Sequence, residues 1–455
     1  MNPSILSADI VLTMDRDNRV IESGGVCVDG NLIVGVDAFD VLRERFPEAA
    51  VRHLPRRLLM PGLINGHCHS GLLRGTAEGL PLWDWLRLHI DPMHRVLDPH
   101  EAAVASYLCY AEALLSGTTT IVDMWRFMDG SARAAETLGN RVIMVPYVGA
   151  KAGFDYFDTL DDNERLLEAW CGKANGRIMP WVGLEHVLYA DEVGYRRAVE
   201  LCRRFNVGFH THSNETRAEV VAMERRYGHR PIPLLEQFGL LEPRTVLLAH
   251  GVWLDDAEIG LLAERRNVGI THNPTSNMKL ASGAAPVQKL LDAGVAVALG
   301  SDGEKENNNL DMFEEMKVAS LLAKFHHMDA AALDSWDIVR MATIGGARAV
   351  GLDDEIGSLE VGKKADVVAV RLDTPRMTPV ALGTLFNVHH NIVHAVQGAD
   401  VDLTMVDGRI VVDDGVLRSA ELDRLLAEAN AAAARLFSRR ADYLAAHADG
   451  EVSAI

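Results

Sequence analysis

The spacing of apolar and polar positions changes twice along the chain, near residue 59 and near residue 352. Residues 4 to 40 alternate short apolar runs with turn residues, and Asp29-Gly30 between two such runs is a hairpin signal. The same alternation of short apolar runs and turn residues recurs at 365–370 and 401–412. Two β-rich ends around a different middle predict one small β-sandwich domain, assembled from residues 1–58 and 353–418.

The middle of the chain, residues 59–352, alternates apolar runs with segments of helical period, which is typical of repeated β/α units. One predicted helix starts after Asp98, which can cap it, with Pro99 in the first position and Glu101 completing a capping box. Eight candidate strands favour a (β/α)8 barrel of the TIM type. They cover residues 58–69, 119–124, 142–148, 178–186, 206–212, 245–250, 267–272 and 295–302. A C-terminal helix is predicted within 419–455.

Composition narrows the range of partners. The 455 residues include 64 acidic and 45 basic side chains, a formal net charge of -19, which disfavours nucleic-acid polymers and anionic membranes as partners. The five cysteines form no Cys-x-x-Cys pair, which is typical of a reducing compartment. Neither a signal peptide nor a bilayer-spanning apolar run is recognisable. We therefore expect a cytoplasmic protein with a small-molecule partner, and a homo-oligomer stays open.

Polar residues occupy the carboxyl ends of six predicted strands. In a (β/α)8 barrel these ends converge on the mouth where active sites are built. A lone core histidine would show no such pattern. The residues are His67, His69, His186, His212, His250, His272 and Asp302.

Two of these strands carry pairs of histidines with the spacing of metal ligands. His67 and His69, two apart on a strand, project from one face and can reach the same ion. His210 and His212 also share a face; His212 lies nearer the mouth, and His210 is interpreted as a buried supporting residue. Asp302 ends an apolar strand, where a metal or a hydrogen-bonded water would compensate its charge.

Two further residues are candidates for proton transfer. Glu215 follows His212 by three residues, on a loop from which it could relay a proton, although a solvated loop carboxylate is the ordinary alternative. His250 ends an apolar run and would face a bound water or the substrate.

At these residues the sequence resembles the amidohydrolase superfamily, in the branch of methylthioadenosine/S-adenosylhomocysteine deaminase, guanine and cytosine deaminases and triazine hydrolases. The resemblance covers nearly the whole chain. It rests on PGLINGHCHS at 61–70, GTTTIVDM at 117–124, HSNE at 212–215, LLAHGVWL at 247–254, THNPTSNMKL at 271–280, LGSDG at 299–303, NNNLDMFEEMK at 307–317, MATIGGARAVGL at 341–352 and IGSLEVGKKADVVAV at 356–370.

The resemblance implies one divalent ion, usually Zn²⁺ and sometimes Fe²⁺, held by His67, His69, His212 and Asp302. Such an ion lowers the pKa of a bound water from ~15.7 toward ~7 and so generates a hydroxide nucleophile. The resemblance assigns Glu215 as the proton shuttle and His250 as the residue that orients the nucleophile, and Asp302 would accept the second proton. The fourth strand has no lysine, which disfavours a binuclear site.

The positions expected to contact the substrate follow the family pattern less closely than the metal ligands do. His94 stands where nucleoside deaminases of the branch carry a ribose-binding glutamate, and a histidine cannot accept two hydroxyl hydrogen bonds as a carboxylate does, which argues against a ribonucleoside. His186 matches a substrate-contacting histidine. Arg126 could meet an anionic or carbonyl group, or be a surface arginine. The remaining candidates for the pocket are Glu185, His272 and Trp83.

Three functions follow from this sequence. The first is a hydrolytic deaminase of an aminated nitrogen heterocycle, such as a purine, pterin or triazine. The second uses the same site to remove chloride, alkylamine or thiol from a ring, or to open a cyclic amide. The third, disfavoured by the intact set of ligands, is a non-enzymatic scaffold. Release of ammonia separates the first from the second.

Overall fold

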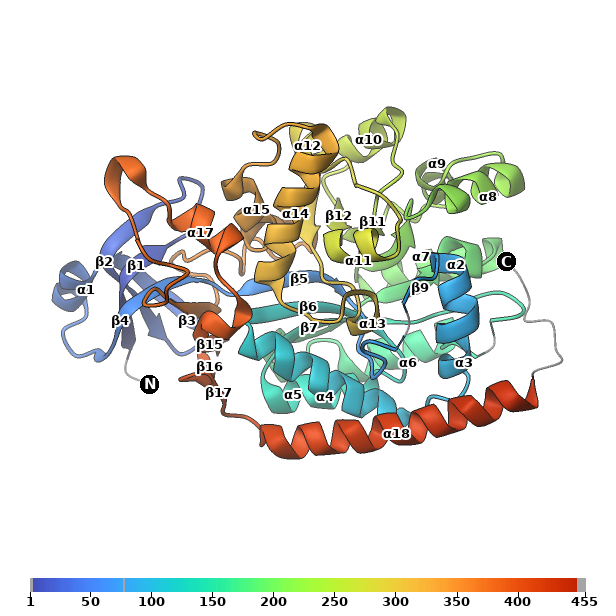
Figure 1. Ribbon diagram of the computed structural model, residues 1–455, viewed down its shortest axis with the longest axis horizontal. Helices are drawn as coiled ribbons and strands as arrows, with labels where there is room; N and C mark the ends of the chain where they lie inside the picture. Colours follow the sequence, from blue (N-terminus) through green and yellow to red (C-terminus); the bar gives the residue numbers. More distant parts are fainter. Residues whose placement is uncertain (1–2, 77, 155, 448–455) are drawn as a thin grey trace.

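The computed structural model describes residues 3–76, 78–154 and 156–447. A mixed β-sheet lies at one end of the molecule and a barrel of strands and helices forms the rest (Figure 1). The (β/α)8 TIM-type barrel with a small sheet domain built from the chain ends, predicted from the sequence, is confirmed. No helix among the described residues combines the length and the apolar character needed to cross a membrane.

Both ends of the chain contribute strands to the mixed sheet. Its eight strands are hydrogen-bonded in the order β17-β16-β15-β14-β4-β1-β2-β3. The two halves meet where residues 57–61 pair antiparallel with 367–371, which joins the chain ends into one body. The strands are β1 (Ser4–Leu12), β2 (Val20–Asp29), β3 (Leu32–Ala38), β4 (Ala50–Pro61), β14 (Val367–Arg371), β15 (Val401–Val406), β16 (Arg409–Asp413) and β17 (Val416–Leu417).

The barrel consists of two parallel sheets that close on each other. Backbone hydrogen bonds cross one seam from Glu185 N–H to Val148 O (3.0 Å) and the other from Asp302 N–H to His67 O (3.0 Å). The strands are β5 (Leu63–Cys68), β6 (Thr118–Trp125), β7 (Arg141–Pro146), β8 (Ile178–Pro180), β9 (Val182–His186), β10 (Phe209–Ser213), β11 (Val246–His250), β12 (Val268–His272) and β13 (Ala296–Leu299).

Two predicted strands are each divided in the structure. The strand predicted over 58–69 is the end of β4 followed by β5, because Pro61 lacks an N–H and Gly62 turns the chain into the barrel. Only glycine fits there: a Cβ on Gly62 would lie 2.3 Å from Thr119 Oγ1. The strand predicted over 178–186 is interrupted after Pro180 for the same chemical reason.

Helices cover the barrel between successive strands. They are α4 (Pro99–Leu115), α5 (Asp129–Leu138), α6 (Leu160–Trp170), α7 (Glu192–Phe205), α8 (Arg217–Tyr227), α9 (Pro231–Gln237), α10 (Asp256–Ala263), α11 (Pro274–Lys279), α12 (Val287–Asp292), α13 (Glu304–Asn307), α14 (Met312–His327), α15 (Ser335–Met341) and α16 (Ile344–Ala349). The shorter or flanking ones are α1 (Phe39–Arg45), α2 (Leu82–Trp85), η1 (Leu86–Ile90), α3 (Asp91–His94), η2 (Ala174–Gly176), η3 (Val187–Tyr189), η4 (Gly383–Leu385), α17 (Val388–His394) and η5 (Gly398–Asp400).

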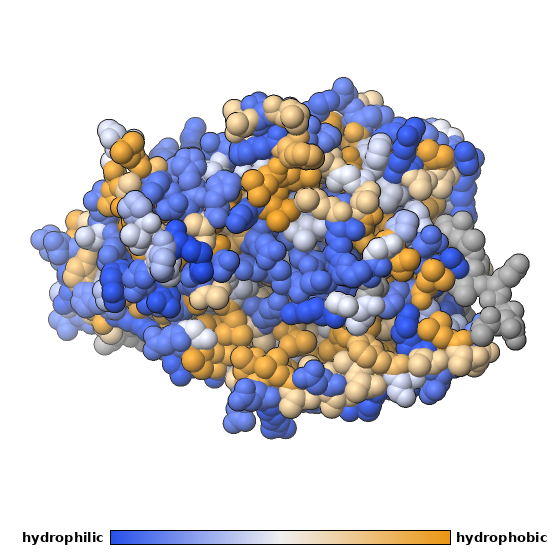
Figure 2. Space-filling view, in the orientation of Figure 1, coloured by the Kyte–Doolittle hydropathy of each residue, from blue (hydrophilic) through white to orange (hydrophobic). Residues whose placement is uncertain are grey.

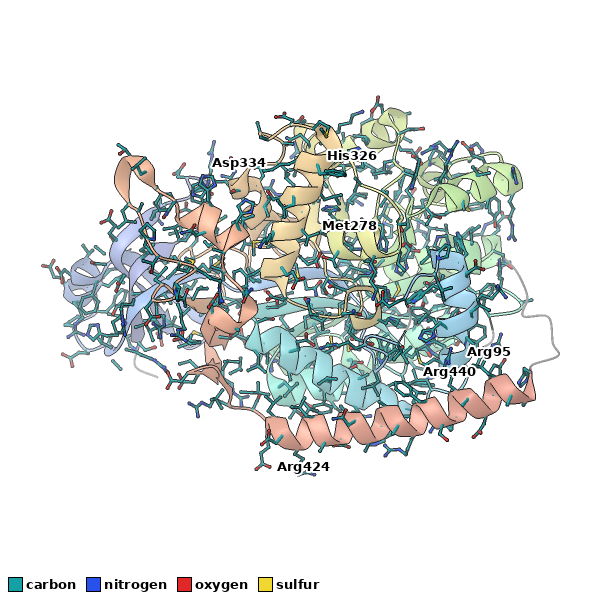
Figure 3. The ribbon with its side chains drawn as sticks, in the orientation of Figure 1. Arg95, Met278, His326, Asp334, Arg424 and Arg440 are labelled. Atoms are coloured by element: carbon teal, nitrogen blue, oxygen red, sulfur yellow. The ribbon has the colours of Figure 1, made fainter. Side chains whose placement is uncertain are left out.

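The predicted C-terminal helix is α18 (Leu422–Ala446), which runs along the outside of the barrel against α4 and α3, at the lower edge of Figure 1. Its small residues Ala429 and Ala432 are buried, so the alanine-rich face packs as expected. Arg440 extends toward the segment before α3 and donates to His89 O (3.2 Å; Figure 3). Hydrophobic residues gather along this edge, whereas most of the remaining visible face is hydrophilic (Figure 2).

Candidate metal centre and active site

Four predicted residues converge at the mouth of the barrel. His67 lies on β5, His69 directly after it, His212 on β10 and Asp302 just beyond β13. The Nε2 atom of His212 is 3.1 Å from that of His67 and 3.2 Å from that of His69, and both of those atoms are 3.4 Å from Asp302 Oδ1. Neighbouring donors at about 2.0–2.2 Å from one ion, with angles of roughly 90–110° between them, lie about 2.8–3.6 Å from each other. This spacing therefore fits one metal ion.

The hydrogen bonds of the three imidazoles leave their converging Nε2 atoms without protons. His69 Nδ1 faces Met124 O (2.7 Å) and His212 Nδ1 faces Glu185 O; a carbonyl only accepts, so both Nδ1 atoms carry the proton. His67 Nδ1 is 2.8 Å from His210 Nε2, and His210 Nδ1 donates to Leu247 O (2.7 Å). His210 therefore accepts the proton of His67.

Three lone pairs thus face one another in a buried site. Burial lowers the pKa of His67, His69 and His212, which keeps the rings neutral. Neutral acceptors 3.1–3.2 Å apart cannot hydrogen-bond to each other. A bound cation would satisfy all three lone pairs at once. The donor set fits a divalent metal.

Asp302 completes the set with a carboxylate. Ser276 Oγ donates to its Oδ2 (2.7 Å) and the Gly303 N–H to its Oδ1 (2.9 Å). The backbone at Asp302 has a φ of 59°, a left-handed conformation that costs energy for a non-glycine residue and is typical of functional sites.

Glu215 and His250 lie beside this centre. His250 Nε2 is 3.7 Å from both Glu215 Oε2 and Asp302 Oδ2, while its Nδ1 donates to Asn277 Oδ1 (2.9 Å). Burial raises the pKa of Glu215, which makes its carboxylate a better proton acceptor. Burial alone would lower the pKa of His250, but the charges of Glu215 and Asp302 outweigh it and raise that pKa.

A cleft opens onto these groups. Its walls include the aromatic rings of Trp83, Trp85, Tyr147 and Tyr189, and none of the described lysines or arginines lines it. The complete lining is His69, Leu82, Trp83, Trp85, Leu86, Tyr147, Glu185, His186, Tyr189, His212, Glu215, His250, Leu280, Asp302 and Glu306. Flat aromatic walls, and carboxyl groups of which only Glu306 has a lysine partner, favour a planar ligand without negative charge.

Three of the predicted substrate contacts, His186, Glu185 and Trp83, line the cleft. The other three do not. Arg126 is not a surface residue: it is buried outside the cleft lining, and its Nε donates to Asp158 Oδ1 (2.8 Å), which compensates its charge internally.

His94 and His272 also lie outside the cleft. His94 stacks on Tyr147 with ring centroids 4.7 Å apart, behind the cleft wall, and both of its ring nitrogens lack a hydrogen-bond partner among the described residues. His272 is buried at the end of β12, and burial lowers its pKa to about 3.

A buried ion pair between Lys305 and Glu306 lies at the site and was not predicted from the sequence. Lys305 Nζ donates to both carboxylate oxygens of Glu306 (2.9 and 3.2 Å), and Glu306 lines the cleft. A Cβ on Gly303 would lie 2.2 Å from Glu306 Oε2, so the glycine makes room for the pair. The charged run 304–306 looks like an ordinary solvated loop in sequence; only its place directly after Asp302 hinted at this role.

Comparison with known proteins identifies the family. The model of the amidohydrolase family matches residues 58–411. The chain belongs to the amidohydrolase family. The match spans the barrel and runs into the C-terminal strands of the mixed sheet.

Several amidohydrolases resemble the chain along nearly its full length. A 5-methylthioadenosine/S-adenosylhomocysteine deaminase of Syntrophomonas wolfei is 36% identical over 94% of this chain and 98% of its own. A 5'-deoxyadenosine deaminase of Methanothermobacter thermautotrophicus is 41% identical over 92% and 97%. The crystal structure of a zinc-bound adenosine deaminase from Xanthomonas campestris matches with a TM-score of 0.88 and 32% identity over 95% and 98%. A triazine hydrolase structure, at 23% identity, TM-score 0.87 and coverage of 95% and 100%, shares the fold.

Proposed function

We propose that this amidohydrolase binds one divalent ion, Zn²⁺, through His67, His69, His212 and Asp302. The support is the convergence of three proton-free Nε2 atoms and one carboxylate, with four pairs of these donors 3.1–3.4 Å apart. The zinc in the related Xanthomonas structure favours zinc over iron. Metal analysis of the purified protein tests this: about one zinc per chain is expected, and iron or two ions per chain would contradict it.

We further propose that the enzyme hydrolytically deaminates an aminated nitrogen heterocycle, such as a purine. One observation carries this proposal: His250 Nε2 lies 3.7 Å from each of two carboxylates, so three groups that can exchange protons surround the metal centre. The relatives named as nucleoside deaminases support the same reaction.

Each group has a distinct part in this reaction. When bound, the metal ion supplies Lewis-acid activation of the attacking water. Glu215 takes a proton from that water and passes it to a ring nitrogen of the substrate, for which its raised pKa suits it. His250 orients the attacking oxygen, and Asp302 accepts the second proton and delivers it to the departing amine.

The cleft accounts for how the ring is held. Trp83 meets His186 edge-on with centroids 5.5 Å apart, and the two form one wall beside the metal centre. We propose that a flat heterocycle lies against this wall and that Glu185 and His186 hydrogen-bond to its edge.

A screen for ammonia release tests the reaction. Zinc-loaded protein is incubated with aminated heterocycles, with and without ribose, and ammonia is measured. We expect release from at least one ring, and from the free base in preference to the riboside. Complete turnover of a ring without ammonia would point instead to removal of another substituent.

Glu215→Gln tests the proton relay. The amide keeps the shape of the side chain but cannot take a proton, so kcat should fall by roughly 10²- to 10⁴-fold while zinc stoichiometry is unchanged. Glu192→Gln, at the exposed start of α7, is the matched control and should keep full activity. Wild-type turnover in Glu215→Gln would refute the assigned role.

A further inference from the structure

Glu185 carries an unused hydrogen-bonding position inside the cleft. Its side chain is 5% exposed, and Oε1 accepts a hydrogen bond from the Tyr147 hydroxyl (3.1 Å). Oε2 has no partner among the described residues. A buried carboxylate oxygen without a partner is energetically unfavourable, so this atom points to a ligand that completes it.

No lysine or arginine among the described residues pairs with Glu185, and His186 beside it in the chain lies 3.4 Å from Glu219 Oε1. Among the described residues, its one contact with a nitrogen base is His212 Nδ1, 3.9 Å from Oε1, and that proton is donated to the Glu185 carbonyl. Two other buried basic side chains are occupied elsewhere: Arg126 pairs with Asp158, and Lys305 pairs with Glu306. The missing partner is therefore a donor that arrives with the substrate.

The position of Glu185 restricts which part of a substrate it can reach. Oε1 lies 3.9 Å from Nδ1 of His212, and Nε2 of the same ring faces the metal position, so the carboxyl group stands one imidazole ring away from the metal centre. A group on the heterocycle itself lies within this range, whereas a substituent extending out of the cleft does not. The donor should thus be an N–H of the ring or of an amino group on it.

We propose that Glu185 determines substrate specificity by accepting, at Oε2, a hydrogen bond from a second N–H of the heterocycle, distinct from the amino group that is removed. This rests on the proposed deamination and narrows its substrate class to rings with at least two N–H donors. Tyr147 acts as a positioning residue, because its hydroxyl holds Oε1 and leaves Oε2 directed at the substrate.

Pairs of rings that differ by one donor test the proposal. 9-Methyladenine is compared with 2,6-diamino-9-methylpurine, and 2-amino-1,3,5-triazine with 2,4-diamino-1,3,5-triazine, by kcat/KM for ammonia release. The wild type should prefer the donor-rich member by roughly ten- to hundredfold, the effect of one hydrogen bond to a charged group. In Glu185→Leu this ratio should fall toward one, and in Tyr147→Phe it should fall partway.

The matched control is Glu192→Leu, whose exposed carboxylate lies on α7 and should leave the ratio unchanged. A preference that survives in Glu185→Leu, or a wild type that prefers the donor-poor ring, overturns the proposal. Calorimetric measurement of ring binding to zinc-loaded Glu215→Gln tests the role of Glu185 separately from the proposed deamination. If no ring releases ammonia, the deamination is wrong; equal affinity of that variant for both members of each pair overturns the role of Glu185 by itself.

Discussion

His210 is expected to control metal affinity without touching the metal. Its Nε2 accepts the Nδ1 proton of His67 (2.8 Å), and its own Nδ1 proton goes to Leu247 O (2.7 Å). In His210→Leu the His67 proton would lose its acceptor in a fully buried site. The ring of His67 would then either keep a buried unpaired N–H or move the proton to Nε2, where it blocks the metal.

The size of the effect follows from this hydrogen bond. Leaving a buried donor unpaired costs about 1–3 kcal/mol. Since about 1.4 kcal/mol corresponds to a tenfold change, zinc affinity should fall by roughly 10- to 100-fold, the range seen when the hydrogen-bond partner of a ligating histidine is removed. His210→Gln, whose amide oxygen can still accept, should lose less.

Competition with a zinc chelator of known affinity measures the change. His272→Leu is the matched control, because His272 is equally buried at a neighbouring position on β12 but has no hydrogen bond to a ligand. That variant can lose stability yet should keep wild-type zinc affinity. Unchanged zinc affinity in a folded His210→Leu protein would refute the proton chain inferred here.

Two further predictions concern stability, measured by denaturant unfolding. Gly62→Ala should lower the free energy of unfolding by about 1–3 kcal/mol, because the added Cβ would meet Thr119. Gly260→Ala, in open space on α10, should raise it by up to about 1 kcal/mol. Equal effects of the two substitutions would contradict the packing argument. Burial raises the pKa of Asp91 to about 6, so the folded state binds more protons than the unfolded one and stability falls as pH rises from about 4 to 6. Asp91→Asn should flatten this slope and gain about 3 kcal/mol at pH 7; an unchanged slope would refute it.

Much of the metal centre could be predicted from local pattern. His67 and His69, two apart on one strand, and Asp302 after an apolar run already indicate side chains that share a face or end a strand. Closure of the barrel then brings the strand ends together at its mouth, independently of the conformation of the loops. The supporting role predicted for His210 agrees with its hydrogen bond to His67.

The substrate end of the site was less predictable because its members are chosen by partners distant in sequence. Arg126 was a candidate contact until the structure showed Asp158, 32 residues away, taking its charge. His94 occupies a position that favoured a substrate role, yet it stacks behind Tyr147. Local pattern contains no information about either pairing.

The sequence by itself determined the alternation of strands and helices, the two-ended sheet and the residues that meet at the mouth, since each depends on period and order along the chain. Only the tertiary structure decided which polar atoms are satisfied. Glu185 illustrates the difference: its place at the end of a strand is visible in sequence, but its unpaired Oε2 emerges only once Tyr147 has taken the other oxygen. Hydrogen bonding between distant segments is a property of the folded chain, and in this protein it separates the residues that hold the fold from those left to meet a substrate.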